Sequence, residues 1–210
     1  MTAEPLFDYA VIGAGIAGAS VAYRLSASAS VAVLEREAQP GYHSTGRSAA
    51  MFMETYGTAQ IKALTRASRA FYENPPQGFS EHPLLSPRGV LYIATPEQRD
   101  LLQEVYDDFR SQSPNVALIG AEQAVERVPC LRGDQICGAI EEPDARDIDV
   151  HALHQGFLRG MVRQGAVLHN NAEVVSAAHA DGAWTLTLAD GRSLRARALV
   201  NAAGAWADHT

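Results

Sequence analysis

The sequence predicts an α/β fold in which a nucleotide-binding domain with a parallel sheet is interrupted by an inserted α+β region. A strand, a glycine-rich turn, a helix and a second strand occupy residues 9–35, and strand patterns recur at 167–200. The segment between them mixes helical and strand patterns. The 210 residues are 47% hydrophobic and 20% charged, which is typical of a globular chain with a buried core.

The first unit of this fold is a βαβ motif. Residues 9–12 (YAVI) and 31–34 (VAVL) are short apolar runs that fit buried parallel strands. The turn GAGIAG covers residues 13–18, and residues 19–28 have the apolar spacing of a helix. The motif has about the ~30 residues expected of a βαβ unit.

The middle of the chain is predicted to alternate helices and strands. A helix over 61–72 should end before Pro75, a strand should cover 90–94, and Thr95 should cap a helix that reaches about residue 111. A short helix follows at 121–128. Residues 133–149 hold six acidic side chains and one arginine, so this run is predicted to be a solvated connection.

The last third of the chain returns to the first domain. Asp149 can cap a helix over 150–164, and a strand is expected at 167–169. Three alternating runs, 173–178, 184–188 and 194–200, are separated by Asp-Gly pairs, which are strong hairpin signals. The predicted domains are therefore 1–80 with 150–210, incomplete at the C-terminal end, and 81–149.

The glycine motif has the spacing and context of a diphosphate-binding turn. Gly13 allows the tight turn, Gly15 lets a pyrophosphate approach the backbone, and Gly18 lets the helix pack on the strand. The N–H groups at the helix start favour the phosphate charge. Glu35, at the end of the second strand, can accept hydrogen bonds from both ribose hydroxyls and would repel the 2′-phosphate of NADP.

NAD and FAD both bind such a unit, and the segment after Glu35 favours FAD. An NAD enzyme would continue with regular βα units, whereas REAQPGYHSTGRSAA follows here. The hydroxyls, the arginine and the small residues of this stretch suit contact with a second phosphate and a flat ring system.

Longer runs resemble the D-amino-acid oxidase superfamily of FAD enzymes, and within it the bacterial FAD-dependent D-arginine dehydrogenases. The matching segments are VIGAGIAGAS, VLEREAQPGYHSTGRSAA, ASRAFYENPPQGF, EHPLLSPR, ALHQGFLRG and LVNAAGAW. The resemblance implies a Rossmann-like FAD-binding domain and oxidation of the CH–NH₂ group of an amino acid, expected to be a D-amino acid, by hydride transfer to flavin N5. Superfamily members are longer, so an N-terminal fragment is expected, with the ligands of the substrate carboxylate beyond residue 210.

The resemblance also implies which residues hold FAD. They form the glycine turn, the end of the second strand, the polar loop and three positions near the C-terminus: Gly13, Gly15, Ile16, Ala17, Gly18, Glu35, Arg36, His43, Ser44, Thr45, Gly46, Arg47, Ser48, Ala49, Ala50, Met51, Val174, Ala203 and Gly204. Val174 is expected to meet the adenine through its backbone.

The substrate side departs from the D-arginine pattern. Met51 stands where a histidine is expected, Met53 where a threonine is expected, and Val90 where a glutamate would pair with the guanidinium, while Tyr56 is kept. Losing the partner of a buried cation costs several kcal/mol, so a neutral or apolar amino acid is predicted. Ordinary core packing is the alternative for Met51, Met53 and Tyr56. No catalytic residue is assigned.

Charge, hydropathy and the cysteine and histidine positions narrow the possible partners, compartments and metal sites. A net charge of −7 argues against nucleic acid, and no apolar stretch is long enough for a spanning helix. Cys130 and Cys137 are expected to be reduced, and the N-terminus has no basic region before its apolar run, so a cytoplasmic protein is predicted. The resemblance implies that it is bacterial. His151 and His154 lack a third metal ligand and are expected on the wet face of their helix; no metal is predicted.

Other functions stay open at this point. A non-catalytic fragment that binds the ADP part of a cofactor is one, and an oxidase for sarcosine, glycine or a 2-hydroxy acid is another. Oxygen and a quinone are both possible electron acceptors, and the oligomeric state is not predicted.

Overall fold

The computed structural model describes residues 5–209 and divides into two compact units. The first consists of the chain up to Ser48, Pro76–His82 and the chain from Val150 onward; the second consists of Ala49–Pro75 and Pro83–Asp149. The boundaries predicted from sequence placed residues 49–75 with the first domain. In the structure these residues pack in the second unit, because their short strand pairs with a strand near residue 147.

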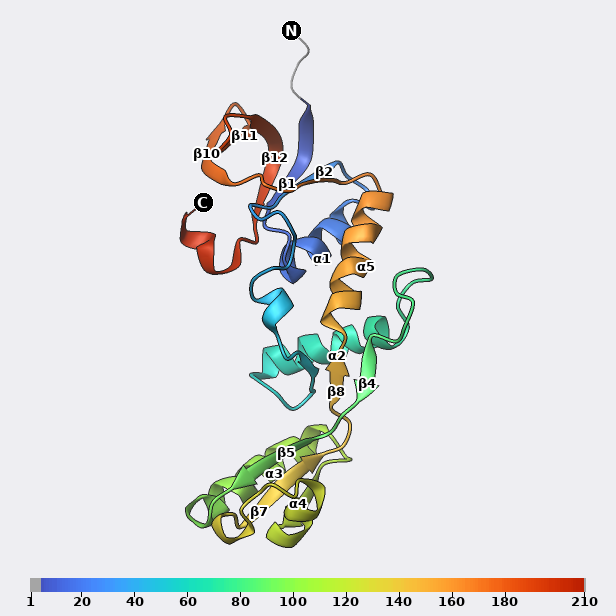
Figure 1. Ribbon diagram of the computed structural model, residues 1–210, viewed down its shortest axis with the longest axis vertical. Helices are drawn as coiled ribbons and strands as arrows, with labels where there is room; N and C mark the ends of the chain where they lie inside the picture. Colours follow the sequence, from blue (N-terminus) through green and yellow to red (C-terminus); the bar gives the residue numbers. More distant parts are fainter. Residues whose placement is uncertain (1–4, 210) are drawn as a thin grey trace. The chain divides into compact units, whose positions relative to one another are not determined.

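The first unit is built on one six-stranded sheet (Figure 1). Its strands are β1 (Leu6–Ile12), β2 (Val31–Leu34), β9 (Val167–His169), β10 (Val174–Ala180), β11 (Ala183–Leu188) and β12 (Ser193–Asn201), in the spatial order β10-β11-β12-β1-β2-β9. Strands β12, β1, β2 and β9 run parallel, and β10-β11-β12 is an antiparallel meander. The predicted parallel α/β fold is confirmed.

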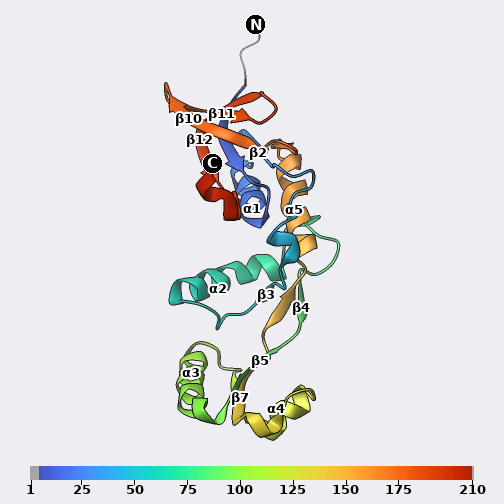
Figure 2. The same cartoon turned by 60° about the vertical axis from the view of Figure 1, so that its left-hand side comes forward.

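Two helices cover one face of this sheet. Helix α1 (Ile16–Leu25) packs against α5 (Val150–Arg163), as both Figure 1 and Figure 2 show. The contact is close because Gly160 leaves room for the ring of Tyr23: a Cβ at Gly160 would lie 2.5 Å from it. Phe79 and Phe157 stack edge-on nearby, with ring centroids 5.1 Å apart.

The meander supplies the core on the opposite face. Leu186, Leu188 and Leu194 form one buried cluster with alternate residues of β1 and β2, including Ile12 and Leu34. The intervening residues of these strands point to the helix side, as expected from the period of two. The hairpin turn at Asp181–Gly182 has positive φ at both residues, which the Asp-Gly pair favours.

The second unit contains two three-stranded antiparallel sheets with the orders β3-β8-β4 and β5-β7-β6. The strands are β3 (Met51–Phe52), β4 (Leu85–Pro87), β5 (Val90–Ala94), β6 (Ala117–Gly120), β7 (Gly138–Glu142) and β8 (Arg146–Ile148); the helices are α2 (Ala59–Glu73), α3 (Arg99–Gln112) and α4 (Ala121–Arg127). Helices α3 and α4 pack on β7, where Ile140 is fully buried. Thr95 and Gln98 form the capping box before α3, so the predicted helix start is confirmed.

The prediction of a solvated connection at 133–149 is wrong. This run contains β7 and β8, the central strands of both sheets in the second unit. Its acidic residues are accommodated by partners from distant segments: Glu141 pairs with Arg127 at 2.8 Å and Asp147 with Arg88 at 2.8 Å. Counting charges along the chain could not reveal these partners.

Short 3₁₀ segments complete the structure. They are η1 (Thr45–Arg47), η2 (Pro96–Gln98), η3 (Gly133–Gln135) and η4 (Gly204–His209). Across residues 5–209, no helix combines the length and the apolar character needed to span a bilayer.

Candidate functional site

A cavity of about 400 Å³ lies in the first unit at the carboxyl ends of β1, β2 and β12. These ends meet because the parallel strands are in register, with Ile12 opposite Asn201 and Leu34. The lining residues come from the glycine turn, the end of β2, the polar loop, the start of β10 and the segment after β12: Ile12, Gly13, Gly15, Leu34, Glu35, Arg36, Gly41, Tyr42, His43, Ser44, Thr45, Ala172, Glu173, Val174, Ala202, Ala203, Gly204, Ala205 and Trp206.

The glycine turn is packed too tightly for side chains. Gly13 has φ +93°, and a Cβ there would lie 2.5 Å from the carbonyl oxygen of Ala202. A Cβ at Gly18 would lie 1.9 Å from the carbonyl oxygen of Gly13. Both glycines therefore bring α1, β1 and the segment after β12 together at the cavity floor.

The start of α1 faces the polar loop. The backbone N–H of Ile16 donates a hydrogen bond to Thr45 Oγ1 at 3.0 Å. A Cβ at Gly15 would lie 3.2 Å from the same hydroxyl oxygen. The loop hydroxyl thus lies at the positive end of the helix dipole, where an anionic group is stabilised.

Glu35 provides a buried carboxylate at the cavity. Glu35 is 8% exposed, and its two carboxylate oxygens accept hydrogen bonds from the backbone N–H groups of Ala14 and Glu37, each at 2.9 Å. A carboxylate oxygen has two acceptor positions, so each oxygen keeps capacity for a further donor. The rigid acceptor pair suits the vicinal hydroxyls of a ribose.

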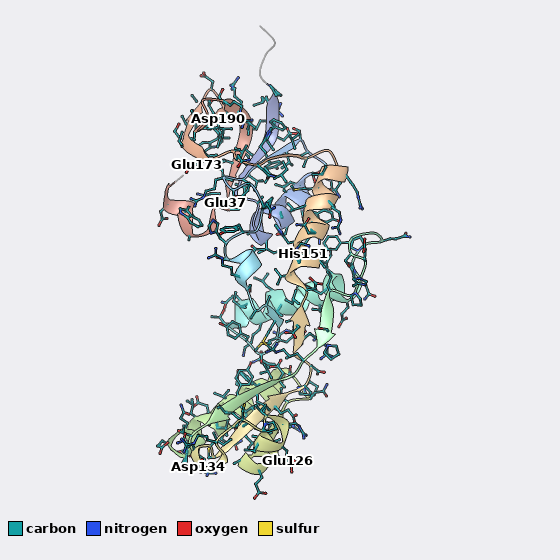
Figure 3. All side chains as sticks on the ribbon, viewed as in Figure 1. Glu37, Glu126, Asp134, His151, Glu173 and Asp190 are labelled. Carbon is teal, nitrogen blue, oxygen red and sulfur yellow. The ribbon has the colours of Figure 1, made fainter. Side chains whose placement is uncertain are left out.

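An aromatic and charged cluster lies beside Glu35. The Arg36 guanidinium is 4.0 Å from the ring centre of Trp206, and the His43 ring centre is 4.5 Å from it. Glu37 Oε1 accepts from His43 Nε2 at 2.8 Å and from Arg36 Nε at 3.1 Å. These hydrogen bonds, that of His43 first, lower the pKa of Glu37. Figure 3 labels Glu37 and Glu173 on this side of the first unit.

Trp206 was missed by sequence reasoning. It follows β12 within a few residues, and β12 is the parallel neighbour of β1. Because parallel strands end at the same edge, a large aromatic residue just after the last strand is a signal that could have found it.

His154 corrects a prediction. It was expected on the wet face of α5, but it is 4% exposed, and its Nε2–H donates to the carbonyl oxygen of Ala14 at 2.7 Å. His151, by contrast, is exposed on the same helix (Figure 3). Spacing alone placed the two histidines near each other without showing that α5 lies against the glycine turn.

The structure brings together many of the residues predicted to hold a cofactor, but not all of them. Gly13, Gly15, Glu35, Arg36, His43, Ser44, Thr45, Val174, Ala203 and Gly204 line the cavity. Ile16 and Ala17 open α1, and Gly18 is a buried residue of the same helix. Arg47 is exposed and lies 5.0 Å from the ring centre of Tyr42, flanked by exposed Gly46 and Ser48. Ala49, Ala50 and Met51 belong to the second unit, so their contact with a cofactor stays a prediction.

The residues predicted for the substrate all lie in the second unit. Tyr56 is 66% exposed and lines a second cavity of about 450 Å³, so it is not a core aromatic residue. Met51 lies on β3 opposite Asp147, and Val90 lies on β5 opposite Glu142. Met51, Met53 and Val90 are half-buried.

Fold and site together define a dinucleotide-binding protein of the Rossmann type. The parallel strands, the glycine turn at a helix start and the acidic residue ending β2 are the three parts that hold an adenosine diphosphate group in this fold. The residues present therefore fit FAD, which contains this group.

Comparison with known proteins gives the family. The family described as DAO, FAD dependent oxidoreductase, matches residues 8–210, and the chain belongs to it. Human mitochondrial dimethylglycine dehydrogenase is 28% identical over 206 residues, covering 94% of this chain and 23% of that protein. L-2-hydroxyglutarate dehydrogenase of Escherichia coli is 23% identical over 214 residues, covering 97% and 49%.

A solved structure supports the fold. Glycine oxidase from Geobacillus kaustophilus superposes with a TM-score of 0.85 at 24% identity, covering 97% of this chain and 56% of that one. The chain thus spans between about a quarter and about half of the length of these relatives. The superfamily predicted from the sequence is confirmed, while the D-arginine dehydrogenase branch stays a prediction.

Proposed function

We propose that this chain is the FAD-binding part of a flavoenzyme that oxidises the C–N bond of an amino acid with a neutral or apolar side chain, expected to be a D-amino acid. The buried Glu35 carboxylate carries the FAD-binding part of the proposal, because it lines the same cavity as Gly13 and Gly15 of the glycine turn. The family match supports FAD as the cofactor.

The chain's own residues would bind and orient the cofactor. Glu35 would accept hydrogen bonds from the ribose hydroxyls and disfavour a 2′-phosphate in their place. The start of α1, together with the Thr45 hydroxyl, would hold the diphosphate. Arg36 and Trp206 line the cavity beside Glu35 and would border the adenosine. When bound, FAD supplies the hydride acceptor at flavin N5.

The preference for a neutral side chain rests on the second unit. Val90 offers no carboxylate, and its neighbour across the strands, Glu142, is 2% exposed and accepts a hydrogen bond from Thr55. A guanidinium beside Val90 would find no carboxylate at that position, and the loss of a buried cation's partner costs several kcal/mol. Met51 and Met53 add adaptable apolar surface.

A 2-hydroxy acid is the second candidate substrate class. The relative named L-2-hydroxyglutarate dehydrogenase favours it, just as the relatives named dimethylglycine dehydrogenase and glycine oxidase favour an amine. The oxidised bond would then be C–O, with the same binding site for the adenosine diphosphate group.

The free thiols of Cys130 and Cys137 fit a reducing compartment such as the cytoplasm. This supports the predicted location, which a fractionation experiment would test.

The test is anaerobic flavin reduction by the FAD-loaded full-length protein across a panel of amino and hydroxy acids. We expect D-methionine, D-leucine or D-phenylalanine to bleach the flavin absorbance faster than D-arginine. Faster reduction by D-arginine would overturn the interpretation of Val90, and faster reduction by a 2-hydroxy acid would support the second candidate. A protein that cannot be loaded with FAD would overturn the proposal.

A further inference from the structure

A buried polar cluster in the second unit is used neither by the cofactor cavity nor by the sheet core. At its centre is Glu142, the last residue of β7, which is only 2% exposed. Glu142 Oε2 accepts a hydrogen bond from Thr55 Oγ1 at 2.5 Å and a longer one from the Tyr92 hydroxyl at 3.5 Å. The nearby backbone of Glu54 also lowers the pKa of this carboxyl. Buried polar groups with this many partners fix the segments that supply them.

The shortest hydrogen bond to Glu142 comes from Thr55, in the segment that carries Tyr56. Thr55 is 2% exposed, whereas Tyr56, the next residue, is 66% exposed and lines the cavity of about 450 Å³. The chain therefore turns from a buried anchor to an exposed aromatic ring within one residue. Glu54 adds a second tether, because its carboxylate accepts from Arg69 Nε on α2 at 2.9 Å.

The cluster joins residues that are far apart in sequence. Thr55 and Glu142 are separated by 87 positions, and Tyr92 on β5 contacts both. A carboxyl group that only filled space in the core would cost free energy compared with an apolar residue. Its shortest hydrogen bond comes from Thr55, the residue before Tyr56, so the group acts on the segment that carries Tyr56.

We propose that Glu142 is a positioning residue which, through Thr55, holds Tyr56 in place at the substrate side of the enzyme. The inference rests on the proposed function, since Tyr56 meets a substrate only if the second unit binds one. Misplacing a binding group by about 1 Å can cost up to ~100-fold in rate.

The test compares single-hydroxyl variants of the same cluster. Thr55→Val removes the bond to Glu142 at almost constant volume, Thr55→Ser restores it, and Tyr92→Phe removes a hydroxyl that does not belong to the loop. We expect amide hydrogen exchange of residues 54–57 to rise about tenfold in Thr55→Val and to stay within twofold of wild type in the other two. Glu142→Leu should raise the exchange of residues 54–57 at least as much. If Glu142→Leu does not fold, Thr55→Val carries the test.

The second readout is kinetic. In Thr55→Val the KM for the best amino acid should rise about fivefold or more while kcat and FAD content stay near wild type, with recovery in Thr55→Ser. A merely structural role would instead lower FAD content and kcat together. Exchange or KM within twofold of wild type in Thr55→Val would overturn the proposal. If no substrate reduces the flavin, the proposed function fails and the role at the substrate with it, while raised exchange would still identify the anchor.

Discussion

The imidazole of His154 donates a hydrogen bond to the carbonyl oxygen of Ala14, 140 residues earlier in the chain. The bond joins α5 to the glycine turn, whose Gly13 and Gly15 line the cavity. Ala14 is fully buried, so its carbonyl has no solvent to replace the donor. The position of the turn therefore depends on a helix from the other end of the unit.

Replacing this histidine should destabilise the protein. His154→Leu leaves a buried carbonyl without its donor, which costs about 1–3 kcal/mol of the free energy of unfolding. His154→Gln keeps a donor and should recover part of it. Urea unfolding measures the difference, with His151→Leu on the exposed side of α5 as the control. Equal effects of the two leucine variants would contradict this view.

Gly13 and Gly165 offer a matched pair. Their φ angles are +93° and +94°, but a Cβ at Gly13 would lie 2.5 Å from the Ala202 carbonyl oxygen, whereas one at Gly165 would have no heavy atom within 4 Å. We expect Gly165→Ala to cost about 1–2 kcal/mol from backbone strain alone. Gly13→Ala should cost several kcal/mol and abolish FAD binding. Urea unfolding and flavin titration measure these effects, and equal costs would show that the turn relaxes freely.

Glu35 should control cofactor affinity. Glu35→Ala removes an acceptor of the ribose hydroxyls and also leaves the Ala14 N–H unpaired. Loss of charged hydrogen bonds of about 1.5–3 kcal/mol predicts a Kd for FAD that is raised about 10- to 100-fold, and Glu35→Gln should lie between. Flavin fluorescence titration measures the Kd. Asp190→Asn, in an exposed turn away from the cavity, should leave the Kd unchanged.

Stability should depend on the titration of Glu142. Burial raises its pKa above 4.5, and the negative charge of Asp144 adds to this, although hydrogen bonds from Thr55 and Tyr92 oppose it. Between pH 4.5 and the raised pKa, the folded state keeps a proton that the unfolded state has lost. The free energy of unfolding therefore falls as pH rises through this window. In Glu142→Gln this contribution is absent, so the variant should gain stability relative to wild type as pH rises above 4.5. Urea unfolding at several pH values measures it, and a constant difference would contradict the raised pKa.

The βαβ unit could be predicted from the sequence because each local signal agrees. The apolar runs, the glycine turn and Glu35 occur in one short window, and β2 was placed at Val31–Leu34 as observed. The hairpins at Asp181–Gly182 and Asp190–Gly191 were found for the same reason: turn chemistry is local.

The second unit was harder to predict because its central strands depend on distant partners. Strand β7 contains Glu141 and Glu142, whose partners Arg127 and Thr55 lie on other elements. A run of acidic residues has the same composition whether water or such partners surround it. The buried position of His154 was hidden in the same way, because helical spacing shows which residues share a face but not what lies against it.

The position of Trp206 at the cofactor cavity has a consequence for fluorescence. The chain has two tryptophans, and Trp206 lines the cofactor cavity, whereas Trp184 lies on the meander strand β11. A flavin absorbs at the wavelengths where indole emits, so loading the cavity should quench Trp206 more strongly than Trp184. The protein thus contains its own fluorescent reporter of cofactor entry, which a Trp184→Phe variant would isolate.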